Sequence, residues 1–166
     1  WPNMVMLFPL RSLHEATGDS RVLPFMTRYF RWQSTVPLED FLSASWQKQR
    51  GGDNLDSILW LYNRTGDAFL LDLAETVFRQ TLDWTGIFHD FPYRERQTEF
   101  DHRIHVVNVA MAIKEPGVFA VQSGDARQRA APRALFRPTP AGRSLMTVSP
   151  LSSYPVVMLY GNAEVA

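Results

Sequence analysis

The sequence predicts an all-α protein built from antiparallel helical hairpins, and two observations carry this prediction. The tripeptide Thr17-Gly18-Asp19 returns 48 residues later as Thr65-Gly66-Asp67. Around both copies, apolar residues recur every three or four positions, which is the periodicity of a helix and not of a strand. The same shift of 48 residues aligns Leu7 with Leu55, Leu10 with Ile58, Leu13 with Leu61, Val22 with Leu70, Leu23 with Leu71 and Phe30 with Phe78.

The tripeptide itself predicts a tight turn between two helices. Glycine suits the left-handed residue that ends a helix, and aspartate accepts backbone N–H bonds at the start of the next one. Each repeat is therefore expected to be a helix, a turn and a second, antiparallel helix. A third, weaker copy is Ser123-Gly124-Asp125, and Pro116 in the apolar run before it predicts a kink or a break in the preceding helix.

Two long connections between the predicted hairpins favour a closed toroid over an open solenoid. They lie at residues 36–52 and 86–99, and both are rich in aromatic and charged residues. Stacked α-hairpins can form either architecture. Long decorated loops are more typical of the rim of an enzyme cavity than of a scaffold repeat. We therefore expect residues 1–125 to form part of an α/α toroid, and the open solenoid is the alternative.

The chain changes character after Asp125. Residues 1–125 carry twelve Lys and Arg against sixteen Asp and Glu, whereas residues 126–166 carry five against one. Pro132, Pro138 and Pro140 fall where the repeat requires another helix, and proline disrupts a helix interior. We therefore expect an irregular tail over residues 126–166, either unfolded or read in a shifted frame, after a folded domain at 1–125.

Composition restricts the partners and the chemistry. The chain contains no cysteine, which excludes disulfides, thiolate metal sites and a cysteine nucleophile within it. No apolar run reaches the length of a membrane span, and no signal peptide is visible. We expect no membrane partner and favour the cytoplasm, although a chain that begins with Trp1 leaves the location open. The scattered arginines of the tail lack aromatic interleaving, so no nucleic-acid partner is expected.

Three blocks of sequence resemble helices of one enzyme family. In order they read WQKQRGGDN at residues 46–54, WLYNRTGD at 60–67 and HVVNVAMA at 105–112. The ordered set resembles the catalytic domain of the β-L-arabinofuranosidases of glycoside hydrolase family 127, over about residues 1–125. This resemblance implies an (α/α)6 toroid that hydrolyses L-arabinofuranosyl or related plant-glycan linkages. The chain would then be a fragment that supplies about half of the barrel.

The resemblance also implies a reaction chemistry that this chain does not carry in full. In the family, a cysteine nucleophile is held on zinc by further cysteines and a glutamate, and a separate glutamate acts as acid/base. Since the chain has no cysteine, we expect no cofactor within it and no hydrolysis by the chain alone. An incomplete barrel also predicts self-association through exposed apolar faces. The competing hypothesis is a non-catalytic helical-repeat module for binding or structure.

Four residues are candidates for sugar binding. His105 matches a family histidine that points into the sugar pocket, and neutral imidazole offers one donor and one acceptor to a hydroxyl. Asp53 and Asn54 are expected where a loop enters a helix, with plain N-capping as the alternative. Many family members carry Gly-His-Gln-Glu where this chain has Gly-Gly-Asp-Asn, so a different substrate preference is expected. Trp46 offers a flat apolar face to a furanose ring.

Three further features have weaker functional interpretations. Lys48 and Arg50 could bind a carboxylate group of a ligand, but surface pairing with Asp53 is the favoured interpretation. Glu99, His102 and His105 are spaced three apart and suggest a metal site, but a charged helix start is the favoured interpretation. Glu164 follows a short segment similar to the one before the family's acid/base glutamate, which makes it the candidate catalytic residue.

Overall fold

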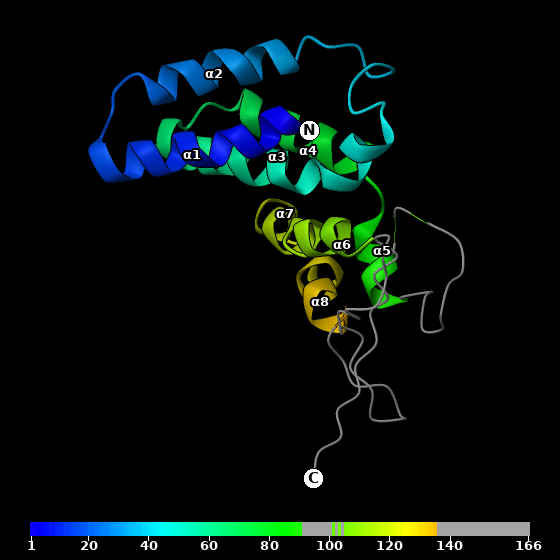
Figure 1. Ribbon diagram of the computed structural model, residues 1–166. Coiled ribbons are helices and arrows are strands. Elements are labelled where there is room, and N and C mark those ends of the chain that lie inside the picture. The colour runs from blue at the N-terminus through cyan, green and yellow to red at the C-terminus, as the bar shows by residue number, and fades with distance from the viewer. Residues whose placement is uncertain (91–100, 102, 104, 136–166) are drawn as a thin grey trace, which may run out of the picture. The chain divides into compact units, whose positions relative to one another are not determined.

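A computed structural model describes residues 1–90, 101, 103 and 105–135, and all regular structure in these ranges is α-helical (Figure 1). The prediction of an all-α fold is therefore confirmed. The chain divides into two compact units, Trp1–Leu82 and Asp83–Ala166. None of the described helices combines the length and the apolar character needed to cross a membrane. The first unit contains α1 (Pro2–Thr17), α2 (Val22–Gln33), α3 (Ser45–Thr65) and α4 (Phe69–Gln80), and the second contains α5 (Trp84–His89), α6 (Val106–Ala112), α7 (Glu115–Ser123) and α8 (Ala126–Leu135).

The two repeated tripeptides form the predicted turns of the first unit. Gly18 ends α1 with φ 67° and Gly66 ends α3 with φ 70°, both in the left-handed region that favours glycine. Their N–H groups donate to the carbonyl oxygens of His14 and Tyr62, each at 2.8 Å. The Asp19 carboxylate accepts the Arg21 N–H at 2.9 Å just before α2 begins. Both turns thus have the left-handed glycine that the repeat predicts, and the first also has the predicted aspartate acceptor.

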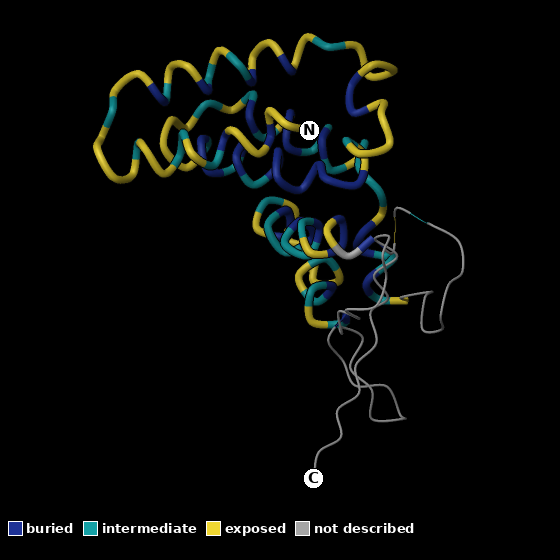
Figure 2. Tube along the Cα trace, viewed as in Figure 1, coloured by how far each residue is buried: buried dark blue, intermediate teal, exposed yellow. Residues whose placement is uncertain are grey.

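Helix α3 is the central element of the first unit, because it contacts α1, α2 and α4. Leu55, Ile58 and Leu61 have no exposed surface, and long stretches of the helix are buried (Figure 2). Helices α2 and α4 are amphipathic and bury one face each. The apolar residues that fill the core from these two helices are Val22, Met26, Phe30, Leu70, Leu73, Ala74 and Val77.

Polar contacts tie α1 to α3 along the half of the hairpins that carries the turns. The Arg11 guanidinium donates to Asp56 at 2.7 Å. The Glu15 carboxylate accepts from Arg64 at 2.8 Å and from the indole N–H of Trp60 at 2.7 Å. Since these groups keep contact with water, each pair adds at most about 1 kcal/mol.

The second unit contains the third hairpin. Helix α6 ends at Ala112 and α7 begins at Glu115, with Pro116 in its first turn, so the predicted break is confirmed. Gly124 ends α7 with φ 74°. The Asp125 carboxylate then accepts the N–H of Arg127 at 2.7 Å and that of Gln128 at 3.4 Å. This arrangement is the helix start that the third tripeptide predicts.

The structure corrects the expectation of irregular chain directly after Asp125. Residues Ala126–Leu135 form α8, and Pro132 lies inside it. A single proline removes one backbone hydrogen bond. The buried side chains of Ala131 and Leu135, with no exposed surface, keep the helix packed on its unit. Pro138, Pro140 and the rest of the expected tail lie outside the described residues.

Candidate functional site

The segment that carries Trp46, Asp53 and Asn54 is all helix. Helix α3 starts at Ser45, where the Gln47 side-chain oxygen accepts the Ala44 N–H at 3.1 Å. The expectation that residues 51–54 form a loop entry or an N-cap is therefore wrong. All four residues lie inside α3 and are buried, with Asp53 1% and Asn54 0% exposed.

Tertiary packing explains one of the two glycines inside this helix. Each glycine costs about 1 kcal/mol relative to alanine in a helix, so local preference alone would end the helix there. At Gly51, however, an added Cβ would lie 1.9 Å from Cγ2 of Thr81, and 3.5 Å from Cδ1 of Leu42. The close approach of Thr81 to α3 thus requires a residue without a side chain at this position.

Arg50 lies beside these glycines and is buried between two indole rings. Its guanidinium carbon is 4.0 Å from the ring centre of Trp1 and 4.6 Å from that of Trp46. Burial lowers the pKa of Arg50, and the nearby charge of Asp53 opposes that shift. Arg50 is only 6% and Asp53 1% exposed, so the two charges do not lie on the surface, where the pairing was predicted. The stacked cation instead helps to hold Trp46, which stays 37% exposed.

Asn54 is held by a partner on α2. Its side-chain N–H donates to the Gln33 oxygen at 2.8 Å, and the Gln33 N–H donates back to the Asn54 oxygen at 3.4 Å. Gln33 also donates to the Tyr29 hydroxyl at 2.9 Å. Since Asn54 has no exposed surface, its role in this arrangement is to fix the Gln33 amide.

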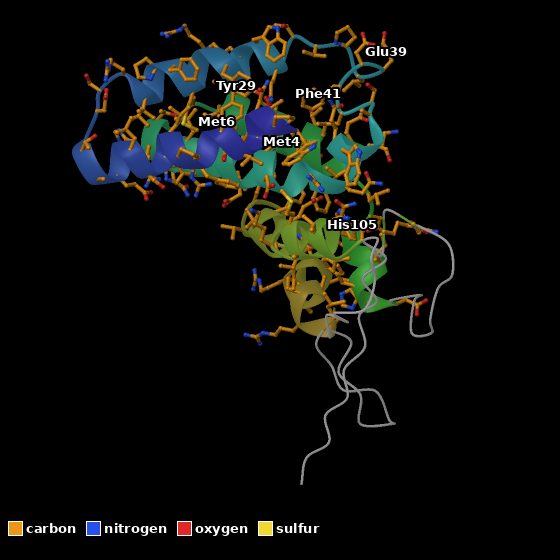
Figure 3. The ribbon with its side chains drawn as sticks, viewed as in Figure 1. Met4, Met6, Tyr29, Glu39, Phe41 and His105 are labelled. Carbon is orange, nitrogen blue, oxygen red and sulfur yellow. The ribbon has the colours of Figure 1, made fainter. Side chains whose placement is uncertain are left out.

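A pocket of about 150 Å³ opens next to this polar pair. It lies where α1 begins, α2 ends and the connection to α3 folds over them. Figure 3 labels Met4, Tyr29 and Phe41, which come from these three segments. Burial raises the pKa of Tyr29, and hydrogen bonds to Gln33 and Asn3 oppose the shift. Sequence reasoning missed this pocket, although the long connection expected at 36–52 was a signal for a rim here; in the structure this connection ends where α3 begins at Ser45.

His105 occupies the position that the sequence predicts, directly before a helix. It is the N-cap residue of α6, with φ −63° and ψ 117°, and only 6% of it is exposed. Asn108, one turn further along α6, is fully buried. His105 belongs to the second unit, whereas Trp46 and Asp53 belong to the first. Their convergence on one sugar pocket therefore stays a prediction.

The described residues do not match the zinc site that the resemblance implies. Within residues 1–90, 101, 103 and 105–135, no group of three His, Asp or Glu side chains could hold a metal ion. The whole sequence offers no thiolate, so the residues of this chain do not fit the cysteine-rich zinc site of the family. Glu99, His102 and Glu164 lie outside the described residues, and their suggested roles remain predictions.

Comparison with known proteins yields one match. The sequence profile described as "Beta-L-arabinofuranosidase, GH127 catalytic domain" matches residues 3–144. No curated protein matches the chain significantly, and neither does any solved structure. The matched range spans all eight described helices and runs past the boundary expected at residue 125.

Proposed function

Because the chain belongs to the family of the β-L-arabinofuranosidase GH127 catalytic domain, we propose that it contributes the sugar-binding part of a glycoside hydrolase for L-arabinofuranosyl or related plant-glycan linkages. Catalytic domains of this family are α/α barrels, and their substrates are carbohydrates. The family match over residues 3–144 is the observation that carries the proposal. The described helical hairpins agree with it.

Four residues have proposed roles in this binding. Trp46 stacks on the apolar face of the sugar ring. Asp53 and His105 form hydrogen bonds with sugar hydroxyls, for which a carboxylate and an imidazole are suitable partners. Asn54 contributes by holding Gln33 in place, as their reciprocal hydrogen bonds suggest.

We further propose that this polypeptide binds its sugar without hydrolysing it. The nucleophile that the family resemblance implies is a cysteine, and the chain has none. Glu164 remains the proposed acid/base residue of a complete enzyme.

We also propose that the chain associates with itself through exposed apolar side chains. Four of the most exposed in the first unit are Met6, Phe25, Trp32 and Leu38. Sedimentation velocity should show a concentration-dependent mass, and a monomer at all concentrations would contradict this part.

Sugar binding and hydrolysis can be tested on the same sample. The purified chain is titrated with methyl L-arabinofuranoside by calorimetry, and an aryl L-arabinofuranoside reports hydrolysis. We expect saturable binding without release of the aryl group. His105→Ala should weaken binding tenfold or more, which corresponds to about 1.4 kcal/mol.

His89→Ala is the matched control for this experiment. His89 lies in the same unit, on α5, and contacts the carbonyl oxygen of Arg127 at 2.8 Å. The control should leave sugar binding unchanged. Equal losses in the two variants would contradict the assigned role of His105. Zinc-dependent hydrolysis by the unmodified chain would contradict the proposal that it is inactive alone.

A further inference from the structure

The pocket of the first unit has the size of a single ring. Its volume of about 150 Å³ equals that of an engineered protein cavity that takes up one benzene molecule. Trp1 and Met4 close it at the start of α1, Tyr29 and Gln33 at the end of α2, and Phe41 from the connecting segment. The pocket therefore has room for one monosaccharide residue.

The polar side of this pocket is held in place before any ligand arrives. Gln33 is only 6% exposed, and its amide is fixed by hydrogen bonds to Asn54 and to the Tyr29 hydroxyl. Tyr29 also has a hydrogen bond with Asn3, another lining residue. Both N–H groups of Gln33 already donate to Tyr29 and Asn54, so the Gln33 oxygen can offer a sugar hydroxyl its second lone pair, and the Tyr29 hydroxyl can offer its proton. A pre-ordered polar wall also lowers the entropy cost of binding.

The remaining walls indicate a neutral ligand. Indole and phenyl rings of Trp1, Trp32 and Phe41 line the pocket, and such surfaces pack against the C–H faces of sugars. Asp40 carries the only charged side chain among the described residues that line it. Its carboxylate accepts hydrogen bonds from hydroxyl groups. Trp1, which also lines the pocket, carries the N-terminal ammonium, so the two opposite charges give the wall no net preference for an anion or a cation.

We propose that this pocket is a binding subsite for one neutral sugar residue. None of Trp46, Asp53 and His105 lines it, whereas Asn54, the fourth residue of the proposed sugar site, holds the Gln33 amide of its wall by hydrogen bonds. The inference rests on the proposed function only in that both sites take a carbohydrate. Val36 and Trp32 both line the pocket. A larger side chain at position 36 would therefore reduce the pocket volume, and the resonance of the Trp32 indole N–H should shift when a ligand binds.

The test uses nuclear magnetic resonance of the full chain with L-arabinose and methyl L-arabinofuranoside. Millimolar sugar should shift the Trp32 indole N–H and the Gln33 side-chain amide, whereas inorganic phosphate should not. Val36→Phe fills the pocket, and the affinity for sugar, measured from the concentration dependence of these shifts, should fall at least tenfold. Val121→Phe makes the same change at a position that is 85% exposed in the second unit, and should alter the affinity less than twofold.

A second variant tests the pocket in case Val36→Phe does not fold. Asp40→Ala alters an exposed lining residue and should weaken binding about threefold to tenfold. If sugar leaves Trp32 and Gln33 unshifted, or if both pocket variants bind like the unmodified chain, the subsite is overturned. A loss of binding in His105→Ala with no effect of the pocket variants would overturn only the subsite. Pocket shifts that survive His105→Ala and vanish in Val36→Phe support the subsite.

Discussion

The two ends of the hairpins in the first unit require glycine for different physical reasons. At the short-turn end, Gly18 and Gly66 have positive φ, and a Cβ added to either would meet nothing within 4 Å. At the opposite end, where residues 34–44 connect α2 to α3, Gly51 has no space for a Cβ. The first pair of glycines is required by the local backbone, and the third glycine is required by packing.

Buried polar groups mark the same contrast. The turn-side ion pairs of Arg11 and Arg64 keep contact with water, whereas Arg50 and the Gln33–Asn54 pair on the loop side are almost fully buried. Burying such groups costs free energy that hydrogen bonding and stacking recover only in part. A fold retains such groups most often where they serve a function. This contrast agrees with the proposal that Trp46 and Asp53, at the long-loop end, bind a sugar.

The largest expected effect is at Gly51. Gly51→Ala would bring a methyl group within 1.9 Å of Thr81 Cγ2, so Thr81 or the helix must move. Overpacking of this kind costs roughly 1–3 kcal/mol. Urea denaturation of the variant should show this loss of unfolding free energy.

Thr81→Ser in the same chain is the matched rescue. Serine lacks the methyl group but keeps the hydroxyl that donates to the Phe78 carbonyl at 2.9 Å. The double variant should recover most of the lost stability, which gives a coupling energy that a double-mutant cycle measures. Additive losses would show that Gly51 is required for another reason, and the contrast between the two ends would weaken.

A smaller loss is expected at the turn. Gly66→Ala keeps open space around the new Cβ but forces alanine into φ 70°, which costs about 1–2 kcal/mol. Gly66→Asn should lose less, because asparagine visits this region more readily. The same urea experiment measures both variants. An alanine variant as stable as the unmodified chain would remove the local explanation for this end.

The sequence was sufficient to predict the elements that depend on local chemistry. Both turn tripeptides and the break before Pro116 are present in the structure. Predictions from the sequence were wrong where tertiary contacts override the local conformational preference. Gly51 and Gly52 resemble a helix boundary but lie inside α3, and Pro132 lies inside α8 because its neighbours are buried. Neither outcome is visible without the packing partners.

The candidate site was predictable only in part for the same reason. Trp46 and His105 could be proposed from a family resemblance, and the structure places His105 at the predicted helix start. The stacking of Arg50 between Trp1 and Trp46 joins residues that are 45 positions apart in sequence. The ring-sized pocket likewise combines three separate segments. Periodicity and spacing hold no signal for such contacts.

The smallest expected effect is a pH dependence at the first turn. Hydrogen bonds from the Arg21 side chain and backbone lower the pKa of Asp19 from 3.8 to about 2. The folded chain therefore binds fewer protons at this carboxyl than the unfolded chain, so the stabilisation is complete above pH 3.8 and is lost as the pH falls towards 2. Asp19→Asn keeps an acceptor for the Arg21 N–H but removes the charge.

Urea midpoints of Asp19→Asn and the unmodified chain should differ slightly at pH 7 and converge between pH 4 and pH 2. Asp67→Asn is the control, because the residue two positions after Asp67 is Phe69 where the first turn has Arg21. Since Asp67 has no arginine at that position, the difference in urea midpoint between Asp67→Asn and the unmodified chain should change little between pH 7 and pH 2. If both variants behave alike, the pH dependence comes from general charge repulsion and not from the ion pair of the first turn. The two turns would then be equivalent in their electrostatics as well as in their backbone.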